Sequence, residues 1–315
     1  MESVIEVNQL VKKYRKAEKP AVDGISFEVG KGEFFALLGP NGAGKTTTIS
    51  ILTTTLTKSA GSVRIAGWDI EKDAAQVRRN VGIIFQNPSL DLDLTAEENI
   101  RLHASIYGVF PYRPLYRMMP AAYRKRVEEL AEVVGLKDNL FRKTRGFSGG
   151  MKRKLEIMRS LIHKPQILFL DEPTQGLDAS ARQSIWTYLK QLRQEENLTV
   201  FLTTHYLEEA EEADRVCMVT GGRIAVLGTP DKIKRQLAGP ERIMLGSEEL
   251  ESLKSELDGL GVAYEQQQDT LSVFPGQRSA QQIVSGIRTP LNRLDIRQPT
   301  LEEAYLSLIQ GGEAV

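Results

Sequence analysis

Residues 34–46 read FFALLGPNGAGKT, and this stretch decides the fold. Phe34–Leu38 predicts a buried strand, and the residues after it match the pattern G-x-x-x-x-G-K-[ST] in full. Lys45–Leu56 predicts a helix that begins at the end of this loop. Glycines let the backbone curl so that successive N–H groups point at phosphate oxygens, and the helix adds its positive N-terminal end. The stretch therefore predicts a binding site for a nucleoside triphosphate.

Two residues at the end of this loop carry specific chemistry. We expect Lys45 to neutralise charge on the β- and γ-phosphates, and we expect the Thr46 hydroxyl to ligate Mg²⁺. ATP and Mg²⁺ are the expected cofactors. The predicted nucleotide-binding residues are Gly39, Pro40, Asn41, Gly42, Ala43, Gly44, Lys45, Thr46 and Thr47.

A second apolar stretch, Ile167–Leu170, ends in two adjacent acids, Asp171 and Glu172. Because side chains alternate along an extended chain, the two carboxylates point in different directions. This arrangement lets them divide the work: Asp171 holds Mg²⁺, and Glu172 polarises a water for attack on the γ-phosphorus. Acids after a strand usually belong to a solvated loop, but the complete phosphate loop favours the catalytic interpretation.

Length and composition restrict the class of protein. The chain has 315 residues, which predicts roughly two domains, and its 41% hydrophobic and 26% charged residues are typical of a folded, water-soluble chain. The 41 basic and 41 acidic residues cancel, which argues against a dedicated nucleic-acid binder. The single cysteine, Cys217, lies in an apolar run and fits a reducing cytoplasm. No stretch approaches the roughly 18 apolar residues of a membrane span.

The pattern of elements indicates two domains. Through residues 1–239, short β-rich runs alternate with amphipathic stretches, which predicts an α/β domain with a largely parallel sheet. Residues from about 87 to 165 lack a convincing strand and predict an inserted helical subdomain. Residues 241–315 hold 6 basic and 12 acidic residues, and the order βαββαβ plus a closing helix predicts a small ferredoxin-like α+β domain over 240–315, with an accessory or regulatory role.

The helical subdomain contains an unusual segment, Gly108–Pro120, whose three prolines predict a loop. Its aromatic and methionine content suits a partner surface, and a loop folded back onto its own domain is the alternative. The same subdomain carries two basic clusters, Arg124-Lys125-Arg126 and Lys152-Arg153-Lys154. Such runs are usually solvated helix faces.

A further motif points to a family. Ser148-Gly149-Gly150-Met151 begins a predicted helix with a small hydroxyl and bare backbone, which makes a second anion site. Between the phosphate loop and the Asp-Glu strand, this motif resembles the signature loop of the ATP-binding-cassette (ABC) ATPases. Phe147 and Met151 replace the usual Leu and Gln, a variant that resembles the daunorubicin-resistance type of bacterial exporter ATPase. The ending Gln298–Tyr305 resembles the C-terminal extension of the same subgroup.

The resemblance covers about residues 3–238 and implies a P-loop ATPase fold with further site residues. Tyr14 resembles the aromatic residue that stacks on adenine. Gln86 resembles the glutamine that reaches Mg²⁺ and the attacking water, in a loop linked to the transmembrane partner. His205 resembles the histidine that contacts the γ-phosphate. Asp178, in Gly176-Leu177-Asp178, resembles the loop that crosses to a partner cassette.

The resemblance also implies how such a chain works. Two copies meet head to tail around ATP, and each composite site takes Ser148, Gly149, Gly150 and Met151 from the other chain. This homodimer drives a permease on a separate chain, from the cytoplasmic side of the membrane, and exports a hydrophobic drug-like or lipid-like compound; no nucleic acid is expected. The alternative is a soluble cassette ATPase that acts on the ribosome or nucleic acid, with the basic clusters on phosphate backbones.

Overall fold

The computed structural model describes residues 2–86, 89–239, 241–276 and 278–312. The chain divides into two compact units, Met1–Leu227 and Gly228–Val315. This division lies before the helix α8 (Pro230–Leu237), whereas the sequence pattern predicts a boundary after residue 239. The difference arises because α8 packs against the last helix, α11 (Leu301–Gly312), and so belongs with the second unit.

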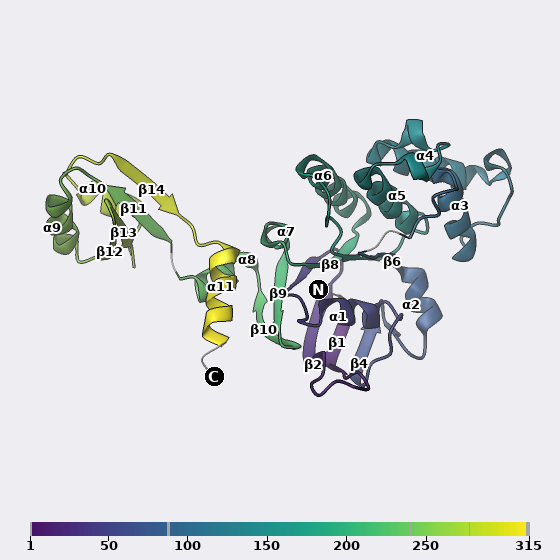
Figure 1. Cartoon of the computed structure of the whole chain (residues 1–315), viewed down its shortest axis with the longest axis horizontal. Coiled ribbons are helices and arrows are strands. Elements are labelled where there is room, and N and C mark those ends of the chain that lie inside the picture. Colours follow the sequence, from purple (N-terminus) through teal and green to yellow (C-terminus); the bar gives the residue numbers. More distant parts are fainter. Residues whose placement is uncertain (1, 87–88, 240, 277, 313–315) are drawn as a thin grey trace. The chain divides into compact units, whose positions relative to one another are not determined.

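The first unit is built around a six-stranded sheet (Figure 1). Its strand order is β10-β9-β3-β8-β7-β6, and the pairs of β3 with β8 and β9, and of β7 with β6 and β8, are parallel. Parallel strands end at a common edge, so the residues that follow them converge there. The strands are β3 (Phe34–Leu38), β6 (Val81–Ile84), β7 (Ile167–Asp171), β8 (Thr199–Thr204), β9 (Arg215–Thr220) and β10 (Arg223–Gly228).

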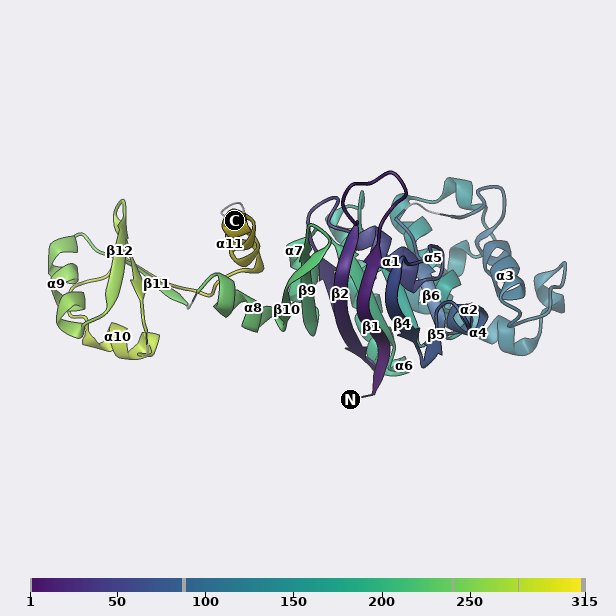
Figure 2. The ribbon, with the colours of Figure 1, turned by 90° about the horizontal axis from the view of Figure 1, so that it is seen from below.

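A second, antiparallel sheet packs on the first, with the order β2-β1-β4-β5 (Figure 2). Its strands are β1 (Ser3–Lys12), β2 (Val22–Gly30), β4 (Ala60–Ile65) and β5 (Trp68–Asp69). The sequence pattern predicts the first three of these strands but not that they form a sheet of their own. Phe27 from this sheet stacks on Phe35 of β3, with ring centroids 5.2 Å apart, so one apolar core joins the two sheets.

Helices fill the rest of the first unit. Figure 1 shows α3, α4 and α5 gathered beyond the β6 edge of the sheet. Helix α1 ends at Leu52 rather than at the predicted Leu56, because a run of threonines follows and Thr54 adopts a left-handed backbone, φ 61°. The helices are α1 (Lys45–Leu52), α2 (Ala74–Asn80), α3 (Ala96–Ile106), α4 (Ala121–Val134), α5 (Gly149–Leu161), α6 (Ala179–Glu196) and α7 (Leu207–Glu211).

The second unit contains a four-stranded antiparallel sheet in the order β12-β13-β11-β14. This order and the succession βαββαβ are those of the ferredoxin-like fold that the sequence predicts. Leu253 and Leu257 of α9 and Ile283 of α10 pack on one face of the sheet. The elements are β11 (Arg242–Gly246), α9 (Leu250–Leu260), β12 (Ala263–Gln267), β13 (Thr270–Phe274), α10 (Ala280–Gly286) and β14 (Arg293–Arg297).

Within the described ranges of both units, each helix is too short or too polar to cross a bilayer.

The small core of the second unit gives a stability prediction. We expect Leu257→Ala to destabilise this unit by about 2–5 kcal/mol, because the fully buried side chain leaves a cavity. Denaturant unfolding followed by hydrogen exchange should locate the loss in residues 242–297. Leu294→Ala, at an exposed position of β14, serves as the control and should change stability by less than about 0.5 kcal/mol. Equal losses in the two variants would contradict the placement of Leu257 in this core.

Candidate nucleotide site

The phosphate loop joins β3 to α1, and its glycines are required by close backbone contacts. A Cβ atom at Gly39 would lie 2.3 Å from the carbonyl oxygen of Val219. Gly44 has φ +99° and precedes α1, and a Cβ there would lie 2.3 Å from the carbonyl oxygen of Ala21. A side chain at either position would clash with these carbonyl groups, so only glycine lets the loop pass this close to Val219 and Ala21.

Lys45 lies inside the curl of the loop. Its Nζ donates to the carbonyl oxygens of Gly39 (2.8 Å) and Pro40 (3.1 Å) and lies 3.9 Å from Glu172 Oε1. Burial lowers the pKa of Lys45, and the carboxylates of Glu172 and Asp171 oppose this effect. The side chain is 5% exposed, so its amino group is held in place between the loop carbonyls and Glu172.

Asp171, the last residue of β7, and Glu172, the residue after it, have different partners. Asp171 is buried and accepts a hydrogen bond from the Thr203 hydroxyl of β8. Burial raises the pKa of Asp171, and the bond from Thr203 opposes the rise. Glu172 turns away with a left-handed backbone, φ 46°, and its N–H donates to the Thr203 carbonyl oxygen, 3.0 Å. The strained backbone aims this carboxylate at the cleft rather than at the core.

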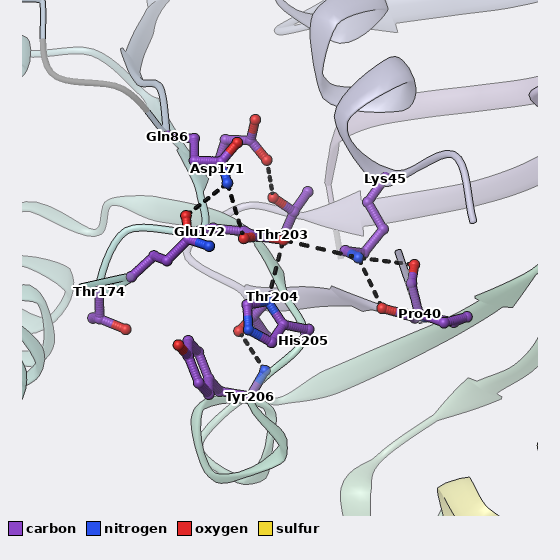
Figure 3. Close-up of polar contacts among 12 residues, drawn as sticks. Pro40, Lys45, Gln86, Asp171, Glu172, Thr174, Thr203, Thr204, His205 and Tyr206 are labelled. Atoms are coloured by element: carbon purple, nitrogen blue, oxygen red, sulfur yellow. Dashed lines mark hydrogen bonds and ion pairs between the residues drawn. The ribbon is translucent and has the colours of Figure 1, made fainter. Parts of the chain in front are cut away.

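Gln86 and His205 meet Glu172 from two other strand ends (Figure 3). Gln86 Nε2 lies 3.3 Å from Glu172 Oε2, and His205 Nδ1 lies 3.2 Å from Glu172 Oε1. Gln86 Nε2 also donates to Gln175 Oε1 at 2.6 Å. Gln175 is a residue that sequence reasoning missed; its position between the acids and the Gly176 loop was the only signal.

A buried carboxylate holds the turn that carries His205. Glu209 of α7 accepts hydrogen bonds from the hydroxyls of Thr174 and Thr204, the latter at 2.6 Å. The Thr204 hydroxyl in turn accepts from the N–H of Tyr206, 2.9 Å. These bonds fix both segments that flank Glu172, and the sequence alone shows Glu209 only as one acid in an acidic helix.

Arg153 is a second missed residue. It is 4% exposed, and its guanidinium donates to the carbonyl oxygens of Pro173 (2.6 Å) and Phe85 (2.7 Å) and pairs with Glu156 (3.0 Å). The prediction that Lys152-Arg153-Lys154 is a solvated face is wrong for its central residue. Burial lowers the pKa of Arg153, and the carboxylate of Glu156 opposes this effect. The side chain ties α5 to the residues that precede Gln86 and follow Glu172.

The side chains of Lys45, Gln86, Glu172, Gln175 and His205 border one cleft of about 490 Å³, whereas Asp171, Glu209 and Arg153 do not line it. Most predicted site residues of the phosphate loop lie along it, together with three polar side chains from other strand ends. Its lining residues are Ala21, Asn41, Gly42, Gly44, Lys45, Thr46, Thr47, Gln86, Glu172, Gln175 and His205. Tyr14, which is 45% exposed, reaches the cleft border through its hydroxyl, 3.2 Å from Thr47 Oγ1.

The predicted signature residues do not line this cleft. Ser148 caps α5 and accepts from the N–H of Met151, 3.2 Å, and Asp178 caps α6 and accepts from the N–H of Ala181, 2.8 Å. A Cβ at Gly150 would lie 2.9 Å from the Cβ of Ala181, so the two helix starts pack closely. One chain thus presents two separate groups of candidate nucleotide ligands.

The strand, glycine loop and helix, with carboxylates at the next strand ends, define a P-loop nucleotide-binding protein. Residues 22–175 match the family described as ABC transporter. The daunorubicin resistance ATP-binding protein DrrA3 of Streptomyces coeruleorubidus is 34% identical, over 98% of this chain and 96% of its own. The Nod factor export ATP-binding protein I of Ralstonia nicotianae is 35% identical, over 97% and 93%. The chain belongs to the ATP-binding subunits of ABC transporters, in the subgroup of the daunorubicin-resistance type, and is an ATPase.

Solved structures agree with this assignment. A structure described as the ATP-binding subunit of an ABC transporter is 30% identical and has a TM-score of 0.65, covering 75% of this chain and 94% of its own. The cassette MJ0796, solved as a dimer in a post-hydrolysis state with ADP and phosphate, is 27% identical with a TM-score of 0.62, covering 71% and 98%. The fold class predicted from the sequence is confirmed.

The buried arginine gives the first prediction for this site. We expect Arg153→Met to destabilise the first unit by about 3–5 kcal/mol, because it leaves the Glu156 carboxylate buried without its cation. The temperature of thermal unfolding and the rate of ATP turnover should both fall. Lys154→Met removes the neighbouring charge, and stability within about 0.5 kcal/mol of the wild type is expected there. If Arg153→Met unfolds at the wild-type temperature, Arg153 does not hold the segments at Phe85 and Pro173 in place.

The raised pKa of Asp171 gives a second prediction. Because the folded state binds the proton more tightly than the unfolded chain, stability falls as pH rises from the ordinary aspartate range, about pH 4, through the raised value. Asp171→Asn keeps an acceptor for Thr203 and removes the buried charge. We expect it to unfold at a higher temperature than the wild type at neutral pH without nucleotide, with the difference shrinking in acid. Asp138→Asn, at an exposed position, should show no such pH-dependent gain.

Proposed function

We propose that this chain hydrolyses ATP with Glu172 as general base and so powers a separate transmembrane permease that exports a hydrophobic compound. One observation carries the proposal. The Glu172 carboxylate meets Lys45, Gln86 and His205 at the edge of the phosphate-loop cleft, at 3.9, 3.3 and 3.2 Å. A carboxylate base with a cation and two polar side chains around it suits the attack of water on a phosphoryl group.

The groups divide the reaction as follows. The oxygen of a water bonds to the γ-phosphorus, its proton passes to the Glu172 carboxylate, and the bond to the bridging oxygen breaks with its electron pair on ADP. Gln86 orients the water, and Lys45 stabilises the charge on the β- and γ-phosphates. His205, whose Nδ1 lies 3.2 Å from Glu172 Oε1, borders the same cleft and contacts the γ-phosphate.

The residues present fit Mg²⁺. Thr46 and Gln86 border the cleft with oxygen atoms, whereas Asp171, which precedes Glu172 in the chain, is buried and does not line the cleft. Hard oxygen donors suit this ion, which usually completes its shell with phosphate and water oxygens. Among the residues that the structure describes, no cluster of three or more His, Cys, Asp or Glu could hold a metal without the nucleotide. When bound, Mg²⁺ neutralises phosphate charge.

We infer that the working form is a head-to-tail homodimer. Ser148, Gly149, Gly150 and Met151 lie outside the cleft of their own chain, although an exposed helix start is a natural anion site. A second copy would place these residues, and the neighbouring Asp178 loop, on the γ-phosphate of the first. Dimeric cassettes among the similar structures support this arrangement.

Transport is supported by the relatives. Those named above act in daunorubicin resistance and Nod factor export, so we propose a hydrophobic or lipid-like substrate and a peripheral place at the cytoplasmic face of the membrane. The basic clusters do not support the alternative, action on the ribosome or nucleic acid. Arg153 is buried, and Arg126 is paired with Glu196 at 2.7 Å, so fewer cations remain for a phosphate backbone.

The general-base role leads to a direct test. We expect Glu172→Gln to bind ATP but to lower turnover by about 10²–10⁴-fold, because the proton acceptor is lost. The variant should accumulate as an ATP-bound dimer in size-exclusion chromatography, whereas Lys45→Ala should lose nucleotide affinity. Glu208→Gln is the matched control, because this exposed glutamate lies outside the cleft. Robust turnover by Glu172→Gln would reject the assigned role.

The same variant tests the partner. Glu172→Gln would be trapped with ATP in an extract of its native cells, isolated in mild detergent, and analysed by mass spectrometry. We expect one multi-spanning membrane protein in a fixed ratio. Recovery of ribosomes or nucleic acid without a membrane protein would overturn the transport proposal and leave the ATPase site intact.

A further inference from the structure

The segment between α3 and α4 loops out at the edge of the helical subdomain in Figures 1 and 2. Part of it is anchored to its own domain. Phe110 packs edge-on against Tyr123, with ring centroids 5.4 Å apart, and Tyr116 packs against Phe141 at 5.2 Å. The Tyr116 hydroxyl donates to Glu128 Oε1 at 2.9 Å, and Met119 is buried. The fold-back interpretation of this loop is therefore correct for these residues.

The residues between the anchors are exposed. Tyr112 is 55% exposed, and Val109, Leu115 and Met118 are also exposed. Ile106, at 72% the most exposed large apolar residue that the structure describes, and Leu102 lie one turn apart on α3, directly before the loop. Anchored backbone with apolar side chains turned to water is the pattern of a contact surface. We call these six residues, Leu102, Ile106, Val109, Tyr112, Leu115 and Met118, the apolar rim.

Within the stretch of chain that carries the apolar rim, the charged residues have one sign. Residues 99–127 contain six Lys and Arg and no Asp or Glu. Arg101 and Arg126 are paired with Glu97 and Glu196, and Lys125 approaches Glu129. Arg113 and Arg117 are exposed, and neither forms an ion pair with any residue that the structure describes. The rim therefore combines exposed apolar and aromatic side chains with uncompensated guanidinium groups.

We propose that the apolar rim binds the surface of a membrane rich in anionic lipid. Anionic headgroups complement Arg113 and Arg117, and the aromatic and aliphatic side chains suit the boundary between headgroups and acyl chains. Tyr112 has an apolar ring and a polar tip, which fits this boundary. This contact goes beyond the proposed function, because it needs neither nucleotide nor permease.

The test uses the purified full chain without nucleotide and sedimentation with vesicles. We expect binding to vesicles of equimolar phosphatidylcholine and phosphatidylglycerol, weakened by salt, and little binding to phosphatidylcholine alone. The double variant Arg113→Ser, Arg117→Ser should weaken binding about 25-fold, at about fivefold for each arginine. Tyr112→Ser with Leu115→Ser should weaken it by about tenfold or more, because apolar contact is lost.

Arg278→Ser with Arg288→Ser is the matched control, since it removes the same charge from exposed positions of the second unit. It should change vesicle binding by less than about twofold. ATP turnover of all variants should match the wild type, which shows that they fold. Absence of binding to anionic vesicles, or equal losses in rim and control variants, would overturn the proposal. If vesicle binding is absent and the rim variants alone lose the membrane protein on isolation, the rim contacts the permease instead.

Discussion

The structure depends on a buried cluster of opposite charges beside the phosphate loop, made by one lysine and two carboxylates. Lys45, Asp171 and Glu172 are each less than a tenth exposed, and the Lys45 ammonium would be unfavourable there without a carboxylate beside it. Arg153 and Glu209 extend the same balance to the segments on either side, through hydrogen bonds to the backbone and to threonine hydroxyls. The strand ends are therefore held at fixed positions before any nucleotide arrives, which is the preorganisation that phosphoryl transfer requires.

Much of this was predictable from local sequence. β3, β12 and β13 have the predicted bounds, because short apolar or alternating runs between turn residues leave little choice. The phosphate loop was also predictable, because its glycines, lysine and threonine form a complete motif within eight consecutive positions. The alternation of an extended chain predicts that the side chains of Asp171 and Glu172 point in different directions, but the left-handed backbone that turns Glu172 to the cleft was not predicted.

Other features depend on contacts that no local pattern reveals. Lys152, Arg153 and Lys154 look alike in sequence, and only the packing of α5 beneath Phe85 and Pro173 buries the middle one. The separation of β1, β2 and β4 into their own sheet follows from pairing partners, which strand patterns do not specify. Gln175 joins the site because the segment after β7 bends back towards Gln86, a residue far away in the chain.

The left-handed backbone of Glu172 has an evolutionary consequence. A non-glycine residue with φ 46° sits in an unfavourable conformation, and glycine or asparagine would relieve it. Either replacement would also remove the carboxylate that meets Lys45, Gln86 and His205. Selection for a more robust fold and selection for turnover therefore pull in opposite directions at this one position. In a lineage that no longer needs to hydrolyse ATP, selection would no longer keep the glutamate at this position. A glycine here would therefore indicate a cassette that has lost ATP hydrolysis.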